Sequence, residues 1–116
     1  MPVMSRDYHL FLDDISKSCE RIQRYVSGMT RETFLADERT YDAVLRHLMI
    51  IGEAVKNLPQ EVRDQYPSVE WKQIARFRDF AVHHYFGIDV KIVWNIVSVE
   101  VPALLAALDA GEQSAP

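Results

Sequence analysis

The sequence predicts an all-α protein, an antiparallel bundle of four to five helices. Apolar residues recur at alternating steps of three and four along most of the chain, which is the spacing of one helix face. Strand signals are absent, because the chain contains no Asn-Gly or Asp-Gly turns and no clear period-two runs. The two longest apolar stripes would also suit a coiled-coil dimer. Breaks at Gly28, Pro59, Pro67 and Gly87 favour the compact bundle.

The first apolar stripe predicts a long helix over residues 5–28. Gly28 stands where this helix should end. Cys19, the only cysteine, belongs to the stripe, so it is expected to be a small core residue and it excludes an internal disulfide. The stripe consists of Tyr8, Leu12, Ile15, Cys19, Ile22, Val26 and Met29.

The second stripe predicts a helix from about residue 38 to 58. One or two helical turns over residues 30–36 are expected before it. Asp37 is the expected N-cap, and Pro59 ends the helix because proline disfavours helical geometry in the residue before it. The members of this stripe are Tyr41, Val44, Leu48, Ile51, Val55 and Leu58.

The rest of the chain predicts three further helices. A short one over residues 60–65 lies between two prolines. The next begins with Ser68 as its N-cap and continues to about residue 84. The last is capped by Asp89 and continues to about residue 108. Pro102 lies inside it and is expected to bend or split it near residue 98.

The bulk composition predicts a single soluble domain. The chain has 116 residues, of which 48% are hydrophobic, enough for one ordinary core. Residues 1–110 are expected to form one bundle and residues 111–116 a disordered tail. The first ten residues already contain Arg6, Asp7 and His9, which argues against a signal peptide. No apolar run approaches the roughly 20 residues of a membrane span, so a cytoplasmic protein without membrane contact is expected.

The net charge of −4 argues against broad, non-specific binding of nucleic acid. It leaves room for a small basic site. Lys72, Arg76 and Arg78 stand within seven residues of one another, next to two histidines. If the chain contacts RNA, the contact is therefore expected to be local, or to need basic residues from a second subunit.

The segment from Arg78 to Tyr85 contains more potentially catalytic side chains than any other part of the chain. An arginine binds phosphate with a planar fork of donors, and a histidine transfers protons near neutral pH, so the segment predicts phosphodiester chemistry. On a helix, Asp79 and His83 share a face, and the carboxylate could fix the tautomer of the ring. An alternative without catalysis stays open. Arg78 and Asp79 could be ordinary surface charges, and His83 could be a histidine at a helix C-terminus, where the helix dipole favours a positive charge.

Helix geometry separates Arg78 from His83. Five residues correspond to about 140° around an ideal helix, so the two side chains cannot meet at one small group. Either the helix ends or distorts near His83, or a second protomer completes the site. His83 and His84 point about 100° apart and would chelate a metal poorly as a pair, so no metal is expected.

Glu53 follows Gly52 in a helix that is otherwise apolar on that side. Glycine inside a helix costs about 1 kcal/mol relative to alanine, so close packing is expected at Gly52. Two readings stay open for Glu53. It could face the site and pair with Arg78 or a histidine, or it could be a surface carboxylate paired with Lys56 or Asn57.

Arg78, His83 and Tyr85 match R-x4-H-x-Y, the signature of the HEPN ribonucleases. The text around them, IGEAVKNLP over residues 51–59 and HHYFGID over residues 83–89, resembles the HepT branch of that family. HepT proteins are toxins of two-gene, type VII-like toxin–antitoxin modules. The resemblance covers roughly residues 5–108.

The resemblance implies an all-α, HEPN-like homodimer. Its two signature segments would meet across the dimer cleft and form a metal-independent endoribonuclease site. Arg78 would neutralise charge on the phosphoryl oxygens, and His83 would transfer the proton. Asp79 would orient His83, and Tyr85 would hydrogen-bond the phosphate or help to hold the loop. Glu53, from its position after Gly52, is a further candidate for a supporting role. Many HEPN members have asparagine at the position of Asp79.

The resemblance also implies two partners, an RNA substrate and an MntA-like nucleotidyltransferase that serves as the antitoxin. In the family, this enzyme silences the toxin by adenylylation of the motif tyrosine, which corresponds to Tyr85. The alternative is a non-catalytic helical bundle that binds a minimal nucleotidyltransferase.

Overall fold

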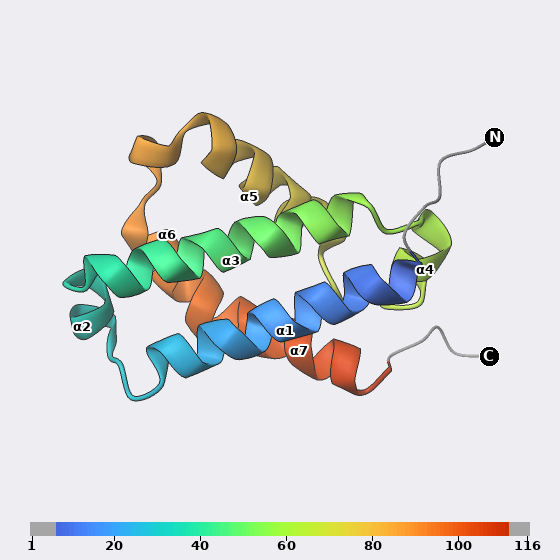
Figure 1. The fold of residues 1–116 in the computed structure, drawn as a ribbon, viewed down its shortest axis with the longest axis horizontal. Coiled ribbons are helices and arrows are strands. Elements are labelled where there is room, and N and C mark those ends of the chain that lie inside the picture. Colours follow the sequence, from blue (N-terminus) through green and yellow to red (C-terminus); the bar gives the residue numbers. More distant parts are fainter. Residues whose placement is uncertain (1–6, 112–116) are drawn as a thin grey trace.

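The computed structural model describes residues 7–111, and every regular element in that range is helical. Figure 1 shows two long antiparallel helices side by side, α1 (Tyr8–Val26) and α3 (Glu38–Lys56). The short helix α2 (Arg31–Leu35) lies in the connection between them. The predicted all-α bundle is confirmed.

The second half of the chain is built from shorter helical pieces. Helix α5 packs on α3, whereas the C-terminal pieces pack on α1 and α2, so α3 lies between α5 and α1 (Figure 1). The pieces in chain order are α4 (Gln60–Asp64), α5 (Trp71–His83), the 3₁₀ turn η1 (Tyr85–Gly87), α6 (Val90–Asn95), the π-helical turn η2 (Ile96–Glu100) and α7 (Val101–Asp109).

The core gathers the apolar stripes of α1 and α3 with the C-terminal helix. Cys19 is fully buried there, and burial raises the pKa of its thiol to about 12. Its predicted role as a core residue is confirmed, because a thiol so hard to ionise is a poor nucleophile. The largest fully buried side chains are Phe34, Ile15, Ile22, Leu45, Val44, Val55 and Val93.

Two predicted helix boundaries are confirmed by their local chemistry. Gly28 follows α1 with a φ of 77°, a left-handed conformation that glycine adopts without a steric penalty. Asp37 caps α3, since its Oδ1 accepts a hydrogen bond from the backbone N–H of Thr40 at 3.0 Å.

The prediction that Ser68 caps the next helix is wrong. Helix α5 begins at Trp71, and its N-cap is Glu70, which makes no side-chain capping bond. Trp71 is buried and its indole N–H donates to the carbonyl oxygen of Arg63 at 3.0 Å. This tertiary anchor, rather than a local cap, determines where the helix starts.

Pro102 distorts the C-terminal helix as expected. The π-helical turn η2 lies directly before it, around the predicted position of residue 98. A proline lacks the N–H that would bond the carbonyl four residues earlier, and its ring crowds that carbonyl. In this turn the Ser98 hydroxyl donates to the carbonyl oxygen of Trp94 at 2.8 Å.

The continuous helix over Val90–Asp109 corrects one expectation. By length and composition it could cross a membrane, contrary to the prediction that no segment could. One such helix is weak evidence, and this one packs against α1. Of the predicted tail, only Gly111 lies within the described residues.

His47 is the one buried histidine among the described residues, and it lies between α1 and α3. Its Nδ1 is 3.2 Å from the Ser18 hydroxyl, and its Nε2 is 3.5 Å from the Tyr25 hydroxyl. Burial, and then the charges of Arg21 and Arg46, lower the pKa of His47. The ring is therefore neutral in the folded protein near neutral pH.

This burial predicts that acid weakens the fold. As the pH falls, the histidine of the unfolded chain, with an ordinary pKa of about 6.5, takes up a proton at a higher pH than His47 of the folded protein does. The contribution of the neutral His47 to the free energy of unfolding is therefore complete above about pH 6.5 and is lost as the pH falls below it. We expect the free energy of unfolding, measured with urea at pH 7.5 and 5.5, to drop less in His47→Gln than in the unchanged protein. Equal drops would contradict this.

Candidate active site

A shallow groove of about 370 Å³ brings α3, α5 and η1 together. One face of α3 forms its floor, and α5 and η1 contribute one side chain each. It contains three of the predicted site residues, Glu53, Arg78 and Tyr85. The lining residues are Asp42, Arg46, Met49, Ile50, Glu53, Arg78 and Tyr85.

Gly52 explains how α5 comes so close to α3 at this point. A Cβ atom added at Gly52 would lie 2.6 Å from Cγ of Arg78 and closer still to its Cβ. Only a residue without a side chain fits between the two helices here. The close packing predicted at Gly52 is confirmed, and it lies directly beneath Arg78.

Arg78 is held by two carboxylates. Its Nη2 is 2.9 Å from Oε1 of Glu53, and its Nη1 is 3.2 Å from Oδ1 of Asp79. Of the two readings for Glu53, pairing with Arg78 is confirmed. The Arg78 side chain is 26% exposed and lies at the wall of the groove, with one terminal nitrogen bonded to Glu53 of α3 and the other to Asp79 of α5.

Asp79 is part of the same charge network. Lys56 Nζ donates to its Oδ1 at 2.9 Å, and the same oxygen meets Arg78. The hydrogen bond from Lys56, and then that from Arg78, lower the pKa of Asp79, so it is a carboxylate at neutral pH. The expectation that Asp79 orients His83 is not met within one protomer, because its hydrogen bonds come from Lys56 of α3 and from the neighbouring Arg78.

Helix α5 ends near His83, as one of the two sequence-based alternatives predicted. Helix α5 stops at His83, and His84 leaves helical geometry with φ −134° and ψ 43°. Tyr85 therefore lies in η1, beyond the helix, and its hydroxyl donates to Oδ1 of Asp42 at 3.2 Å. Desolvation, and then the charge of Asp42, raise the pKa of Tyr85.

His83 does not line the groove. It is exposed, and among the described residues no hydrogen bond or ion pair reaches its ring. His84 is exposed as well, and its ring lies 4.9 Å from that of Phe80. No group of three or more acidic, histidine or cysteine side chains within residues 7–111 could hold a metal ion.

Four groove residues were not predicted from the sequence, and two of them, Asp42 and Arg46, are charged. Both stand on the polar side of the second stripe, where solvent-exposed charges are ordinary. Their spacing to Met49 and Glu53 by helical steps was the available signal, since it places all four on one face. The contact between Tyr85 and Asp42 spans 43 positions and has no sequence signature.

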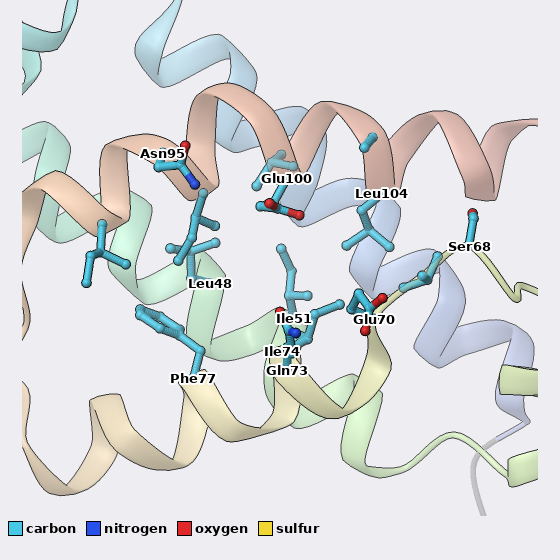
Figure 2. Close-up of a pocket in the computed structure, with 15 residues that line it drawn as sticks. Leu48, Ile51, Ser68, Glu70, Gln73, Ile74, Phe77, Asn95, Glu100 and Leu104 are labelled. Carbon is cyan, nitrogen blue, oxygen red and sulfur yellow. The ribbon is translucent and has the colours of Figure 1, made fainter.

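A larger cavity of about 460 Å³ lies on the other side of α5. Figure 2 shows it between α5, which contributes Phe77 and Ile74, and the C-terminal helix, which contributes Leu104. Two carboxylates, Glu70 and Glu100, also line it. None of the predicted site residues lines this cavity, so the larger of the two cavities is not the predicted active site.

Comparison with known proteins agrees with this picture. The family model described as Ribonuclease HepT-like matches residues 15–110. The chain is 47% identical over 97 residues to the protein named "Putative RNase MJ0127" of Methanocaldococcus jannaschii, covering 84% of this chain and 80% of that one. It is 40% identical over 101 residues to "Probable ribonuclease HepT" of Thermococcus cleftensis, covering 87% and 92%.

No solved structure matches the chain at a comparable level. The family match spans most of the chain, and the matched range contains Glu53, Arg78, Asp79, His83 and Tyr85. The relatives are matched over most of their own lengths as well. The chain belongs to the HepT-like ribonuclease family.

Proposed function

We propose that this chain is a metal-independent endoribonuclease and the toxin of a type VII-like toxin–antitoxin module. The observation that carries the proposal is the groove in which Arg78 and Tyr85 lie together, next to the exposed His83 at the end of α5. The relatives named as ribonucleases support the reaction class. Arg78 and His83 are the proposed catalytic residues.

The reaction proceeds by internal transfer. The RNA 2′-oxygen attacks the adjacent phosphorus and loses its proton to a neutral His83. The bond from phosphorus to the 5′-oxygen breaks, and that oxygen takes a proton from a second, protonated His83. A 2′,3′-cyclic phosphate and a free 5′-hydroxyl result. Arg78 stabilises the charge that grows on the phosphoryl oxygens.

A second copy of the chain supplies the second His83. The proposal of a homodimer is supported by three exposed apolar side chains within three residues of His83 in the chain. Phe80 is 47% exposed, Val82 43% and Phe86 98%. Apolar groups gathered at one place on a surface commonly mark an interface. Two such surfaces in contact would bring two copies of α5 together.

Tyr85 is the proposed point of control by an MntA-like nucleotidyltransferase. Its side chain is accessible, and its hydroxyl is held by the Asp42 carboxylate. Adenylylation would remove the donated hydrogen bond and set a phosphodiester anion beside that carboxylate. The modified side chain would then be repelled from Asp42 and would occupy the path of the RNA backbone.

A non-catalytic subunit that binds a nucleotidyltransferase is the second candidate. It is favoured by the state of Arg78, whose two terminal nitrogens are both engaged by carboxylates. A phosphate would have to compete with Glu53 and Asp79 for the same donors. This candidate predicts harmless expression and a stable complex with the enzyme.

One experiment tests the proposed function. The protein is purified from two preparations, one expressed alone and one coexpressed with an MntA-like nucleotidyltransferase. Each is incubated with RNA in excess EDTA, and the mass of its Tyr85 peptide is measured. We expect the protein expressed alone to cleave RNA into products with cyclic phosphate ends. We expect the coexpressed protein to carry an adenylyl mass on Tyr85 and to cleave no RNA. Absence of cleavage by the unmodified protein, with no toxicity in cells, would favour the binding subunit.

A further inference from the structure

The groove contains a cation that the reaction described above does not use. Arg46 lines it together with Arg78 and Tyr85. Its side chain is exposed, and it makes no ion pair with any described residue. Arg78, by contrast, is neutralised by Glu53 and Asp79. The two arginines of the groove are therefore in opposite electrostatic states.

No ion pair with a described residue occupies the guanidinium of Arg46. Asp42 stands one turn before Arg46 on the same face of α3 and keeps its negative charge, but its carboxylate accepts a hydrogen bond from the Tyr85 hydroxyl and forms no ion pair with Arg46. Glu53, two turns after Arg46, is engaged by Arg78. Both carboxylates of the groove thus have partners, while all five N–H donors of Arg46 remain available for an anion.

The floor beside Arg46 is apolar. Met49 and Ile50 line the groove between Arg46 and Glu53, and both are half-buried. The volume of about 370 Å³ lies in the range of ligand pockets, roughly 300 to 1,000 Å³. A cation next to an apolar floor of this size suits a nucleotide, with the phosphate on the guanidinium and the ribose or base against the two side chains.

We propose that Arg46 is a substrate-binding residue that holds an RNA phosphate next to the one that is cleaved. The proposal rests on the ribonuclease function above, and it separates two tasks in the groove. Arg46 binds the backbone of single-stranded RNA in the ground state. Arg78, held in place by its carboxylates, acts on the reacting phosphate.

The test measures binding apart from cleavage. A fluorescent single-stranded RNA with 2′-O-methyl groups on every ribose cannot be cut by internal attack, so its anisotropy reports affinity alone. We expect Arg46→Ala to weaken binding about tenfold, the worth of one charge-assisted contact. The slope of log affinity against log salt should fall by about 0.7, the value for one phosphate contact on a single strand. Arg46→Lys should retain part of the affinity.

The matched control is Arg24→Ala, which removes an exposed arginine of α1 away from the groove. It should change affinity less than twofold. On cleavable RNA, Arg46→Ala should raise KM with little change in kcat, which a merely structural role would not produce. Equal binding by the two alanine variants would overturn the proposal, and so would a loss of kcat at unchanged KM.

The outcomes also separate this proposal from the proposed function. Binding that depends on Arg46, without cleavage of ordinary RNA, would keep the subsite and reject the ribonuclease. Cleavage of ordinary RNA with no effect of Arg46→Ala would keep the ribonuclease and reject the subsite. Failure of the unchanged protein to bind RNA at all would reject the subsite directly.

Discussion

Replacing His83 with alanine is expected to abolish RNA cleavage and to leave the fold intact. General acid–base catalysis by a positioned side chain contributes about 10² to 10⁴ in rate, and a symmetric dimer would lose both of its proton-transfer groups at once. The fold should be unaffected because the His83 ring is exposed and makes no hydrogen bond to a described residue. Initial rates on cleavable RNA and thermal unfolding check the two parts.

His84→Ala is the matched control for this experiment. His84 is the neighbouring residue, is also exposed, and carries the same imidazole. Its loss should lower the rate far less than the loss of His83, because only His83 matches the signature. If His83→Ala cleaved RNA within threefold of the unchanged protein, the assignment of the proton-transfer role would be wrong.

Gly52→Ala is expected to destabilise the protein and to reduce cleavage together. Alanine favours a helix by about 1 kcal/mol over glycine, whereas overpacking at a tight contact costs about 1 to 3 kcal/mol. The new Cβ would meet Cβ and Cγ of Arg78, which are fixed to the backbone of α5. We therefore expect steric repulsion to exceed the gain in helix propensity, with a net loss of up to about 2 kcal/mol.

The displacement of α5 should also reach the site, because Arg78 stands at the point of contact. Urea unfolding and RNA cleavage measure the two effects. Gly87→Ala is the control for stability, since its added Cβ would meet only Cβ of His84, at 4.0 Å. An unchanged or increased stability of Gly52→Ala would mean that the two helices separate at no cost.

Much of the fold is predictable from the sequence because its signals are local. The apolar stripes of the two long helices, the cap at Asp37 and the distortion before Pro102 each depend on residues close together in the chain. Ser68 has the same local sequence pattern as a helix cap. The prediction that it caps α5 was wrong because the buried indole of Trp71, bonded to Arg63, determines the start of α5.

The candidate site was predictable only in part, for the same reason. Of the three signature residues, Arg78 and Tyr85 line the groove and His83 does not, and the glycine inside a helix indicated the close contact at Gly52. The partner of Tyr85 is 43 positions away, and the pairing of Lys56 with Asp79 joins two different helices. Such contacts depend on how α3 and α5 are placed in space, which periodicity alone does not give.

The buried thiol of Cys19 has a practical consequence for measuring distances in solution. It is the only cysteine, it is fully buried, and its pKa of about 12 makes it unreactive toward maleimides and nitroxide reagents. Arg24→Cys, at an exposed position of α1 away from the groove, would therefore take up a single spin label per chain. In the proposed homodimer, electron–electron coupling between the two labels would report the spacing of the two α1 helices without any further substitution.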